Sequence, residues 1–260
     1  PKEKIRILFL ENISDVAVKN FQRHGYAQTV KISKALTEEQ LMEEIKDVHI
    51  LGIRSKTQLT KKILDAAKKL QAIGCFCIGV NQVDLKAATR NGVVVFNAPY
   101  SNTRSVAELV IGASIMLIRR IPDKNKAAHD GVWMKDAKGS YELRGKTLGI
   151  IGYGNIGSQV SVLAEGLGMK VIFYDVETKL PLGNAEDAKS LKELLQRADV
   201  VTLHVPETSQ TKNLINKTNL KYFRKGAILI NYARGEVVDL EALRKALLEE
   251  SIGGAAVDVY

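Results

Sequence analysis

The chain has 260 residues, which suffices for one large or two ordinary domains, and 45% of them are hydrophobic. No stretch approaches the roughly 18 apolar residues of a membrane helix, and no basic-then-apolar secretory leader is visible, so we expect a cytoplasmic protein with no membrane partner. The net charge of +9 comes from 38 basic and 29 acidic residues that are interleaved and accompany no nucleic-acid motif. We therefore expect a solvated surface that helps attract an anionic substrate, and no nucleic-acid partner.

Apolar runs alternate with helical periods over the first hundred residues, a pattern typical of parallel α/β layers. We predict strands at residues 5–10, 29–32, 49–53, 71–76 and 93–96. Candidate helix caps are Ser14, Thr37 in a capping box with Gln40, Thr60 and Asp84. The two cysteines, Cys75 and Cys77, fall in an apolar run, so we predict structural residues and no redox or metal site.

The character of the chain changes at residues 97–102, which have the proline and small polar residues of a hinge. We therefore predict one domain at residues 1–98 and a second at 99–260. The second begins with a long apolar helix at 106–118, and its strands are predicted at 147–151, 170–174, 200–204, 227–231 and 255–259. A complete dinucleotide-binding sheet usually has six strands, so we expect this sequence to be incomplete at its C-terminus.

A glycine motif follows the strand at 147–151 and opens a helical period: Gly152-Tyr153-Gly154-Asn155-Ile156-Gly157. Its three glycines suit a tight turn, a close approach to pyrophosphate and close helix–strand packing, and the helix start attracts phosphate. This context favours a dinucleotide site over an ordinary glycine turn. We predict an α/β protein of two doubly wound parallel sheets, a flavodoxin-like first domain and a Rossmann second domain.

Asp175 ends the strand at 170–174 and lies 21 residues after Gly154. That spacing suits a carboxylate that accepts hydrogen bonds from the adenosine ribose, although a simple capping role is the alternative. Because a carboxylate repels a 2′-phosphate, NAD is favoured over NADP as the cofactor. Lys179 is near enough in sequence to soften this preference.

Arg234 lies in the segment Asn231-Tyr232-Ala233-Arg234-Gly235, directly after the strand at 227–231. Ligands bind at the carboxyl ends of strands in such sheets. An arginine there can grip a carboxylate and polarise a neighbouring carbonyl, although an ordinary surface arginine is the alternative.

These motifs together resemble those of the D-2-hydroxyacid dehydrogenase family. Residues 234–239 resemble its arginine motif, Leu203-His204-Val205-Pro206 its H-x-P segment, and residues 255–260 its A-x-D-V-F/Y segment. Within the family, residues 74–84, 96–110 and 179–185 are similar to the phosphoglycerate dehydrogenases of bacteria. The resemblance covers essentially the whole chain.

The resemblance implies a substrate domain and an NAD domain, with catalysis in the cleft between them. Arg234 would bind the substrate carboxylate and carbonyl. Besides the motif glycines, the cofactor would contact Asn155, Ile156, Asp175, Val205, Tyr232, Ala233, Arg234 and Asp258. The small anionic 2-hydroxy acid would meet Arg54, Ser55 and Lys56, with Val80 and Asn81 at the cleft floor, although scaffold or solvent roles for Arg54 and Lys56 are the alternative.

The resemblance further implies NAD-dependent oxidation of 3-phospho-D-glycerate to 3-phosphohydroxypyruvate, the first step of serine biosynthesis. The family's proton-transfer histidine and its glutamate follow the A-x-D-V segment and so lie beyond Tyr260. We therefore predict none of the four histidines, His24, His49, His129 and His204, to be the base.

Two alternatives remain open: a related dehydrogenase of glyoxylate, lactate or 2-hydroxyglutarate, and a non-catalytic NAD-sensing protein of the same fold. The family tends to dimerise through the part of the NAD domain that contains Trp133. We therefore expect a homodimer or homotetramer in which Trp133 is a packing or subunit-contact residue.

Overall fold

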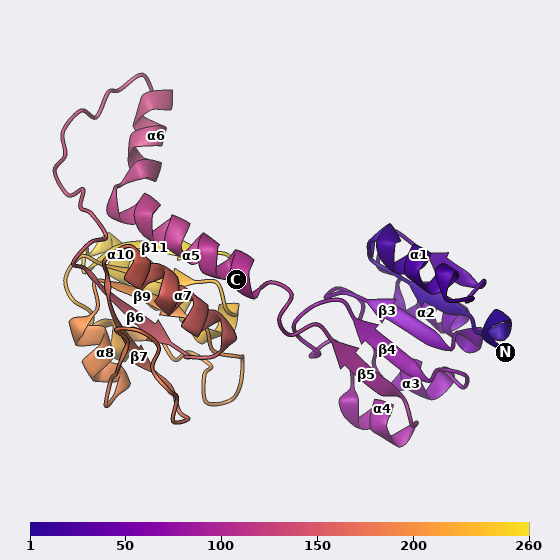
Figure 1. Cartoon of the computed structure of the whole chain (residues 1–260). Helices are drawn as coiled ribbons and strands as arrows, with labels where there is room; N and C mark the ends of the chain where they lie inside the picture. Colours follow the sequence, from indigo (N-terminus) through magenta and orange to yellow (C-terminus); the bar gives the residue numbers. More distant parts are fainter. Residues whose placement is uncertain (260) are drawn as a thin grey trace. The chain divides into compact units, whose positions relative to one another are not determined.

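The computed structural model describes residues 1–259, which form two compact units (Figure 1). The first unit is Pro1–Asn102 and the second begins at Thr103, at the end of the hinge segment 97–102. Each unit has its own parallel sheet with helices packed on it, which confirms the predicted fold class. Among the described residues, no helix has the length and apolarity to span a membrane.

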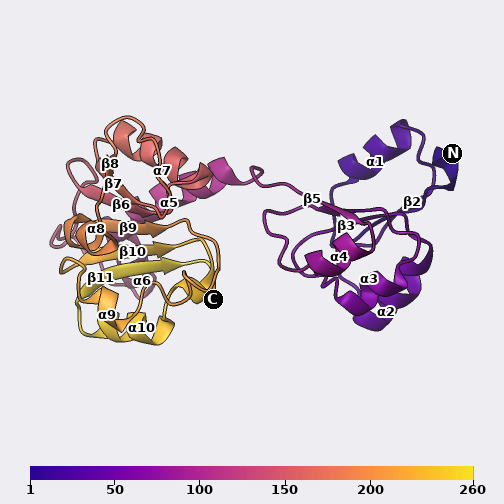
Figure 2. The same ribbon diagram turned by 90° about the horizontal axis from the view of Figure 1, so that it is seen from below.

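The first unit is built on a five-stranded parallel sheet in the order β2-β1-β3-β4-β5, which is the flavodoxin-like order. Its strands are β1 Ile7–Phe9, β2 Thr29–Lys31, β3 Ile50–Ile53, β4 Ala72–Cys75 and β5 Val94–Asn97. Its helices are α1 Asp15–Arg23, α2 Glu38–Glu44, α3 Lys61–Ala66 and α4 Leu85–Arg90, with short 3-10 turns at Lys2–Lys4 and Ile45–Asp47. Figure 2 shows α1 on one side of this sheet and α2, α3 and α4 on the other.

Side chains cap three of these helices as predicted. Ser14 accepts from the Val16 amide, Thr37 and Gln40 form the capping box, and Asp84 accepts from the Ala87 amide. Thr60 occupies the N-cap position of α3 as predicted, but its side chain makes no capping hydrogen bond there. The amide and carbonyl of the preceding residue, Leu59, are instead bonded to the chain before α4, and this pairing fixes the approach to α3.

The second unit contains a six-stranded parallel sheet in the order β11-β10-β9-β6-β7-β8. Its strands are β6 Thr147–Ile151, β7 Lys170–Tyr174, β8 Glu186–Asp187, β9 Val200–Leu203, β10 Ala227–Asn231 and β11 Ile252–Val257. Its helices are α5 Thr103–Ile118, α6 Ile121–His129, α7 Asn155–Gly166, α8 Leu191–Arg197, α9 Lys217–Leu220 and α10 Leu240–Leu248, with a 3-10 turn at Gly235–Val237. Numbered within the unit, this is the 3-2-1-4-5-6 order of a dinucleotide-binding fold, and the order reverses between β6 and β9.

The predicted count of five strands in this unit was wrong, because β8 was missed. It consists of two exposed acidic residues at the edge of the sheet, paired with β7. A strand of that length and polarity leaves no apolar run for a sequence pattern to detect.

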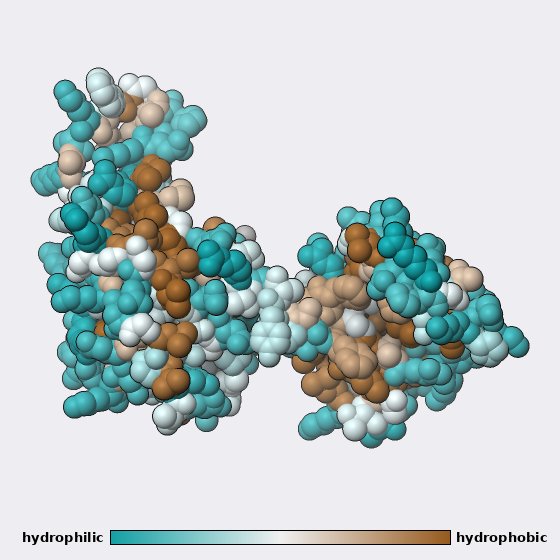
Figure 3. All heavy atoms as spheres, viewed as in Figure 1, coloured by the Kyte–Doolittle hydropathy of each residue, from teal (hydrophilic) through white to brown (hydrophobic). Residues whose placement is uncertain are grey.

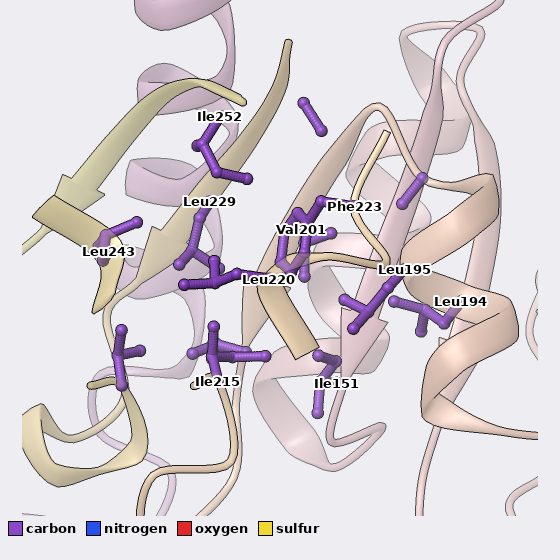
Figure 4. Packing of buried hydrophobic residues seen from close by; sticks show 14 of the residues in the cluster. Ile151, Leu194, Leu195, Val201, Ile215, Leu220, Phe223, Leu229, Leu243 and Ile252 are labelled. Carbon is purple, nitrogen blue, oxygen red and sulfur yellow. The ribbon is translucent and has the colours of Figure 1, made fainter. Parts of the chain in front are cut away.

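The core of the second unit lies on both faces of its sheet. Every residue of the central strands β9 and β10 is buried. One apolar cluster joins these strands to α8, α9 and α10, as Figure 4 shows for Leu194, Leu229 and Leu243. A second cluster joins the sheet to α5 and α7. Burial of each such side chain contributes about 1.5–3 kcal/mol, so the strand ends that carry the site rest on a rigid scaffold.

The two cysteines do not lie on one strand. Cys75 ends β4 and is buried, and burial, with a smaller contribution from Cys77, raises the pKa of its thiol to about 11. Cys77 lies in the following loop, where its thiol donates to the Gly79 carbonyl. A buried thiol with a raised pKa is a poor nucleophile, which supports a structural role for Cys75.

Candidate active site

The glycine turn joins the end of β6 to the start of α7. Gly152 has a φ of +92°, and a Cβ there would lie 2.7 Å from the His204 carbonyl oxygen. A Cβ on Gly157 would lie 2.3 Å from the Gly152 carbonyl oxygen. By contrast, no heavy atom lies within 4 Å of the Cβ position of Gly154. The turn is therefore tightly packed against the protein at Gly152 and Gly157 and open at Gly154, as a diphosphate cradle requires.

The start of α7 can receive an anion. Gly154 occupies its N-cap position, and no side chain of the described residues caps the helix there. The first amide N–H groups of a helix have no partner within the helix, and the dipole makes this end positive. Asn155, the first helical residue, is exposed and Ile156 is half-buried. A phosphate placed here would meet both the free donors and the positive end of the helix.

Asp175 is held directly beside the glycine turn. One carboxylate oxygen accepts from the Tyr153 amide at 2.7 Å and the other accepts from the Glu177 amide at 3.0 Å. These two bonds orient the carboxylate at the carboxyl end of β7, and each oxygen retains capacity to accept from a ribose hydroxyl. Lys179 forms an ion pair with Glu177, so its ammonium already has an acidic partner.

His204 and Val205 follow β9, the strand beside β6 at which the strand order reverses. The His204 amide donates to the Ile151 carbonyl at 2.7 Å, which brings the H-x-P segment against the glycine turn. Its ring contacts the Thr202 hydroxyl at 3.0 Å through Nε2, and Nδ1 is buried with no partner among the described residues. Burial lowers the pKa of His204 to about 4, so the ring is neutral at physiological pH.

Arg234 lies on a turn that Asn231, the last residue of β10, holds closed. The Asn231 side chain accepts from the Ala233 amide at 3.1 Å and donates to the Arg234 carbonyl at 2.8 Å. The Arg234 guanidinium donates to the Ala233 carbonyl at 2.7 Å. The amide of Asp258 donates to the Asn231 carbonyl, so the end of β11 lies beside this turn. Burial, and then the Asp258 charge, raise the pKa of Tyr232.

Within the second unit, the predicted residues thus occupy the carboxyl ends of neighbouring strands. The glycines follow β6, Asp175 follows β7, Val205 follows β9, the Arg234 turn follows β10 and Asp258 follows β11. Tyr260, the last residue of the A-x-D-V-F/Y match, lies outside the described residues. This edge of an open α/β sheet is where ligands bind, next to the reversal of strand order.

The predicted substrate residues occupy the same edge of the sheet in the first unit. Arg54, Ser55 and Lys56 directly follow β3 and are exposed. Neither Arg54 nor Lys56 takes part in an ion pair with another described residue. Val80 and Asn81 lie in the loop after β4, the strand next to β3.

Three buried polar side chains that support these segments were not predicted. They are Glu11 and Gln82 in the first unit and Asn231 in the second. Each of Glu11 and Asn231 is a polar residue at the carboxyl end of an apolar strand, and this signal could have identified them. The sequence pattern could not indicate that the side chains of Glu11 and Asn231 form hydrogen bonds to the backbone of loops.

The chain matches two family models over most of its length. Residues 111–260 match the NAD binding domain of the D-isomer specific 2-hydroxyacid dehydrogenases, and residues 7–184 match the catalytic domain of the same group. The chain belongs to the D-isomer specific 2-hydroxyacid dehydrogenase family. NAD is therefore the cofactor of its second unit, and the open glycine turn, the uncapped helix and Asp175 fit the diphosphate and ribose of this dinucleotide.

Curated relatives of this family member are named D-3-phosphoglycerate dehydrogenase. The chain is 55% identical to that of Haemophilus influenzae over 259 residues and 53% identical to that of Escherichia coli. Each match covers 100% of this chain and 63% of the relative, so the chain spans less than two thirds of their length.

Solved structures with the same fold cover nearly the whole chain. A Thermus thermophilus protein has a TM-score of 0.89 and 32% identity, over 98% of this chain and 82% of its own. A D-lactate dehydrogenase of Aquifex aeolicus, solved with NAD and lactic acid, has a TM-score of 0.86 and 28% identity, over 98% of this chain and 77% of its own.

Proposed function

We propose that the full-length protein oxidises 3-phospho-D-glycerate reversibly to 3-phosphohydroxypyruvate with NAD, in the cytoplasm, as the first step of serine biosynthesis. The observation that carries this proposal is the identity of 53–55% to relatives named for this substrate, along the whole chain. The identity to the structure named for lactate is only 28%.

In this reaction Arg234 would bind the substrate carboxylate and polarise the C2 oxygen. A guanidinium presents a fork of N–H donors that matches a carboxylate, and the Asn231 bonds hold the turn that presents it. Bound NAD would supply the hydride acceptor. Asp175 would hold the adenosine ribose, the start of α7 would hold the diphosphate, and Asp258 would accept from the nicotinamide carboxamide.

We do not propose any of the four histidines of this chain as the base that accepts the proton of the substrate hydroxyl. His24 and His129 bond through Nδ1 to carbonyls of their own helices, and His49 Nδ1 accepts from the Arg6 amide. His204 is neutral, and its buried Nδ1 faces no described partner. We propose that the proton-transfer histidine lies in the part of the full-length protein that follows Tyr260.

The substrate phosphate would meet Arg54 and Lys56. A phosphoglycerate carries a carboxylate and a phosphate, so it needs more cationic groups than Arg234 alone provides. Arg54 and Lys56, separated only by Ser55, are exposed and have no ion-pair partner among the described residues. Two such free cations on one loop suit a doubly charged phosphate.

The test is the rate of NADH formation by the full-length protein with 3-phospho-D-glycerate, D-lactate and D-2-hydroxyglutarate, and of NADH consumption with glyoxylate. We expect the phosphorylated substrate to have the highest kcat/KM, and Arg234→Lys to lower it at least 100-fold. Highest activity on an unphosphorylated acid would assign the protein to another reaction of the family. Binding of NAD without turnover of any of these acids would identify a sensor instead.

We also propose that the protein is a homo-oligomer that buries an apolar surface of the second unit. Figure 3 shows apolar side chains gathered over α5 and α7. Exposed apolar residues of α5 and α7 are Leu109, Met116 and Val162, and Ile121, Val132 and Trp133 are exposed in α6 and the segment after it. A patch of this kind on a soluble domain is typical of a subunit interface.

A further inference from the structure

Glu11, two residues after the end of β1, binds the backbone of the loop that carries Arg54 and Lys56. Its carboxylate oxygen Oε1 accepts from the amides of Arg54 at 3.0 Å and Thr57 at 2.9 Å, and Oε2 accepts from the amide of Lys56 at 2.9 Å. The residue is only 7% exposed. The side chain of Glu11, two residues after β1, therefore closes a loop more than forty residues away in sequence.

The charge of Glu11 is balanced by peptide groups. Burial alone would raise the pKa of this carboxyl, but the hydrogen bonds from Lys56, Thr57 and Arg54 outweigh it and lower the pKa. Among the described residues no lysine, arginine or histidine forms an ion pair with Glu11. Hydrogen bonds to an ionised acceptor are the strong ones, so a buried carboxylate with three amide donors is a firm anchor.

The backbone at Glu11 adopts an unusual conformation to make these contacts. Glu11 has a φ of +58° and the next residue, Asn12, has a φ of +53°. Left-handed conformations cost roughly 1 kcal/mol or more for residues other than glycine. The three amide bonds and the burial of the side chain offset this cost.

A second buried side chain ties the same loop to the loop after β4. Gln82, 5% exposed, donates through Nε2 to the Arg54 carbonyl at 2.9 Å and to the Gly79 carbonyl at 3.3 Å. The backbone carbonyl of Gln82 accepts from the Leu59 amide at 2.7 Å. The proposed substrate residues on the two loops, Arg54 with Lys56 and Val80 with Asn81, are thus fixed to one polar network.

We infer that Glu11, supported by Gln82, is a positioning residue that sets the selectivity of the first unit for a phosphorylated substrate. Because its carboxylate binds the amides of the loop, the cationic side chains of Arg54 and Lys56 are left unpaired for an external anion. The carboxylate also occupies the amide donors of the loop that an anion would otherwise use. The side chains of Arg54 and Lys56 are then the groups that distinguish a phosphorylated from an unphosphorylated substrate. This inference rests on the proposed function, in which the loop binds the substrate phosphate.

The test compares two substrates that differ only in the phosphate, in the full-length protein. Reduction of 3-phosphohydroxypyruvate and of hydroxypyruvate is measured for the wild type and for Glu11→Gln, which places an NH2 donor against an amide N–H of the loop. We expect the KM for the phosphorylated substrate to rise about tenfold, with kcat and the hydroxypyruvate kinetics changed less than about threefold. The Kd for NAD, which binds the other unit, should stay the same.

The matched control is Glu44→Gln, which removes a carboxylate of the same unit that pairs with Arg6 at the surface. It should leave both substrates unaffected. If Glu11→Gln does not fold, Gln82→Met removes the amide donor at nearly constant size and should raise the same KM. An equal loss for both substrates, or no loss in a folded variant, would overturn the inference.

Arg54→Gln separates this inference from the proposed function. If Arg54→Gln raises the KM for 3-phosphohydroxypyruvate and Glu11→Gln does not, the loop binds phosphate without help from Glu11, and only the inference fails. If the wild type shows no preference for the phosphorylated substrate, the proposed function fails first.

Discussion

The side chain of Asn231 makes two hydrogen bonds to the main chain of the turn that presents Arg234. It donates to the Arg234 carbonyl at 2.8 Å and accepts from the Ala233 amide at 3.1 Å, and it is fully buried. Asn231 also belongs to β10, which pairs with both β9 and β11. The turn that presents the guanidinium is therefore held by an interior strand of the sheet.

Replacing Asn231 by aspartate should impair substrate binding. The carboxylate can still accept from Ala233 but would face the Arg234 carbonyl with an unpaired oxygen, at a cost of about 1–3 kcal/mol. We expect kcat/KM for 3-phospho-D-glycerate to fall about tenfold or more, with a much smaller change in the Kd for NAD. Steady-state kinetics and fluorescence titration measure the two.

Asn219→Asp is the control for this variant. Asn219 also donates its side-chain amide to a carbonyl of the second unit, that of Leu214, but outside the site. An equal loss of kcat/KM in both variants would show that Asn231 acts through general stability alone.

Asp175 should determine the choice of dinucleotide. Asp175→Ala removes the carboxylate that would repel a 2′-phosphate and that would accept from the ribose hydroxyls. We expect NAD to bind at least tenfold more weakly, and the ratio of the NADP and NAD dissociation constants to move toward one. Fluorescence titration with both dinucleotides measures this ratio.

Asp187→Ala provides the comparison, because Asp187 is an exposed carboxylate on the neighbouring edge strand β8. It should change neither dissociation constant. A constant NADP to NAD ratio in Asp175→Ala would remove Asp175 from cofactor selection.

The sequence predicted those parts of the fold and site that depend on local order. The glycine turn, Asp175 and the Arg234 turn are each identified by a strand that precedes them, and all three lie at strand ends in the structure. Strand β8 was missed because two acidic residues have no apolar pattern. The anchoring roles of Glu11 and Gln82 depend on hydrogen bonds between segments distant in sequence, which only the folded chain brings together.

Gly157 should tolerate no side chain. A Cβ there would lie 2.3 Å from the Gly152 carbonyl oxygen, which is backbone and cannot move without opening the turn. We expect Gly157→Ala to lower the free energy of unfolding by about 1–3 kcal/mol and to weaken NAD binding. Urea denaturation and titration with NAD measure the two effects.

Gly166, at the other end of α7, is the matched control because no heavy atom lies within 4 Å of its Cβ position. Gly166→Ala should leave NAD binding unchanged and raise the free energy of unfolding by up to about 1 kcal/mol. If both variants have the same free energy of unfolding and the same Kd for NAD, the close packing at Gly157 is not required for stability or for NAD binding.

Trp133 should contribute to subunit contact. Its side chain is 83% exposed in this chain, in a segment with the exposed Val132. We expect Trp133→Ala to shift the full-length protein toward smaller species in sedimentation velocity. Leu180→Ala, at a residue that is 84% exposed beyond β7, should not. An unchanged sedimentation coefficient in Trp133→Ala would place the interface elsewhere.

His204 should make the stability of the protein depend on pH. Burial lowers the pKa of its ring to about 4 in the folded state, against 6.5 for an ordinary histidine. Between these two values the unfolded chain takes up a proton that the folded chain does not. The stability contributed by neutral His204 is therefore complete above pH 6.5 and is lost as the pH falls from 6.5 toward 4.

We expect this loss to reach about 2 kcal/mol, measured as the difference between urea unfolding free energies at pH 7 and pH 4.5. His204→Gln cannot titrate and should show a smaller difference, whereas His129→Gln, at an exposed helix end, should behave like the wild type. Because the ring of folded His204 stays neutral above about pH 4, NAD binding by the folded protein should not change through His204 between pH 6.5 and 4.5. An identical pH dependence in the wild type and His204→Gln would assign the effect to other groups.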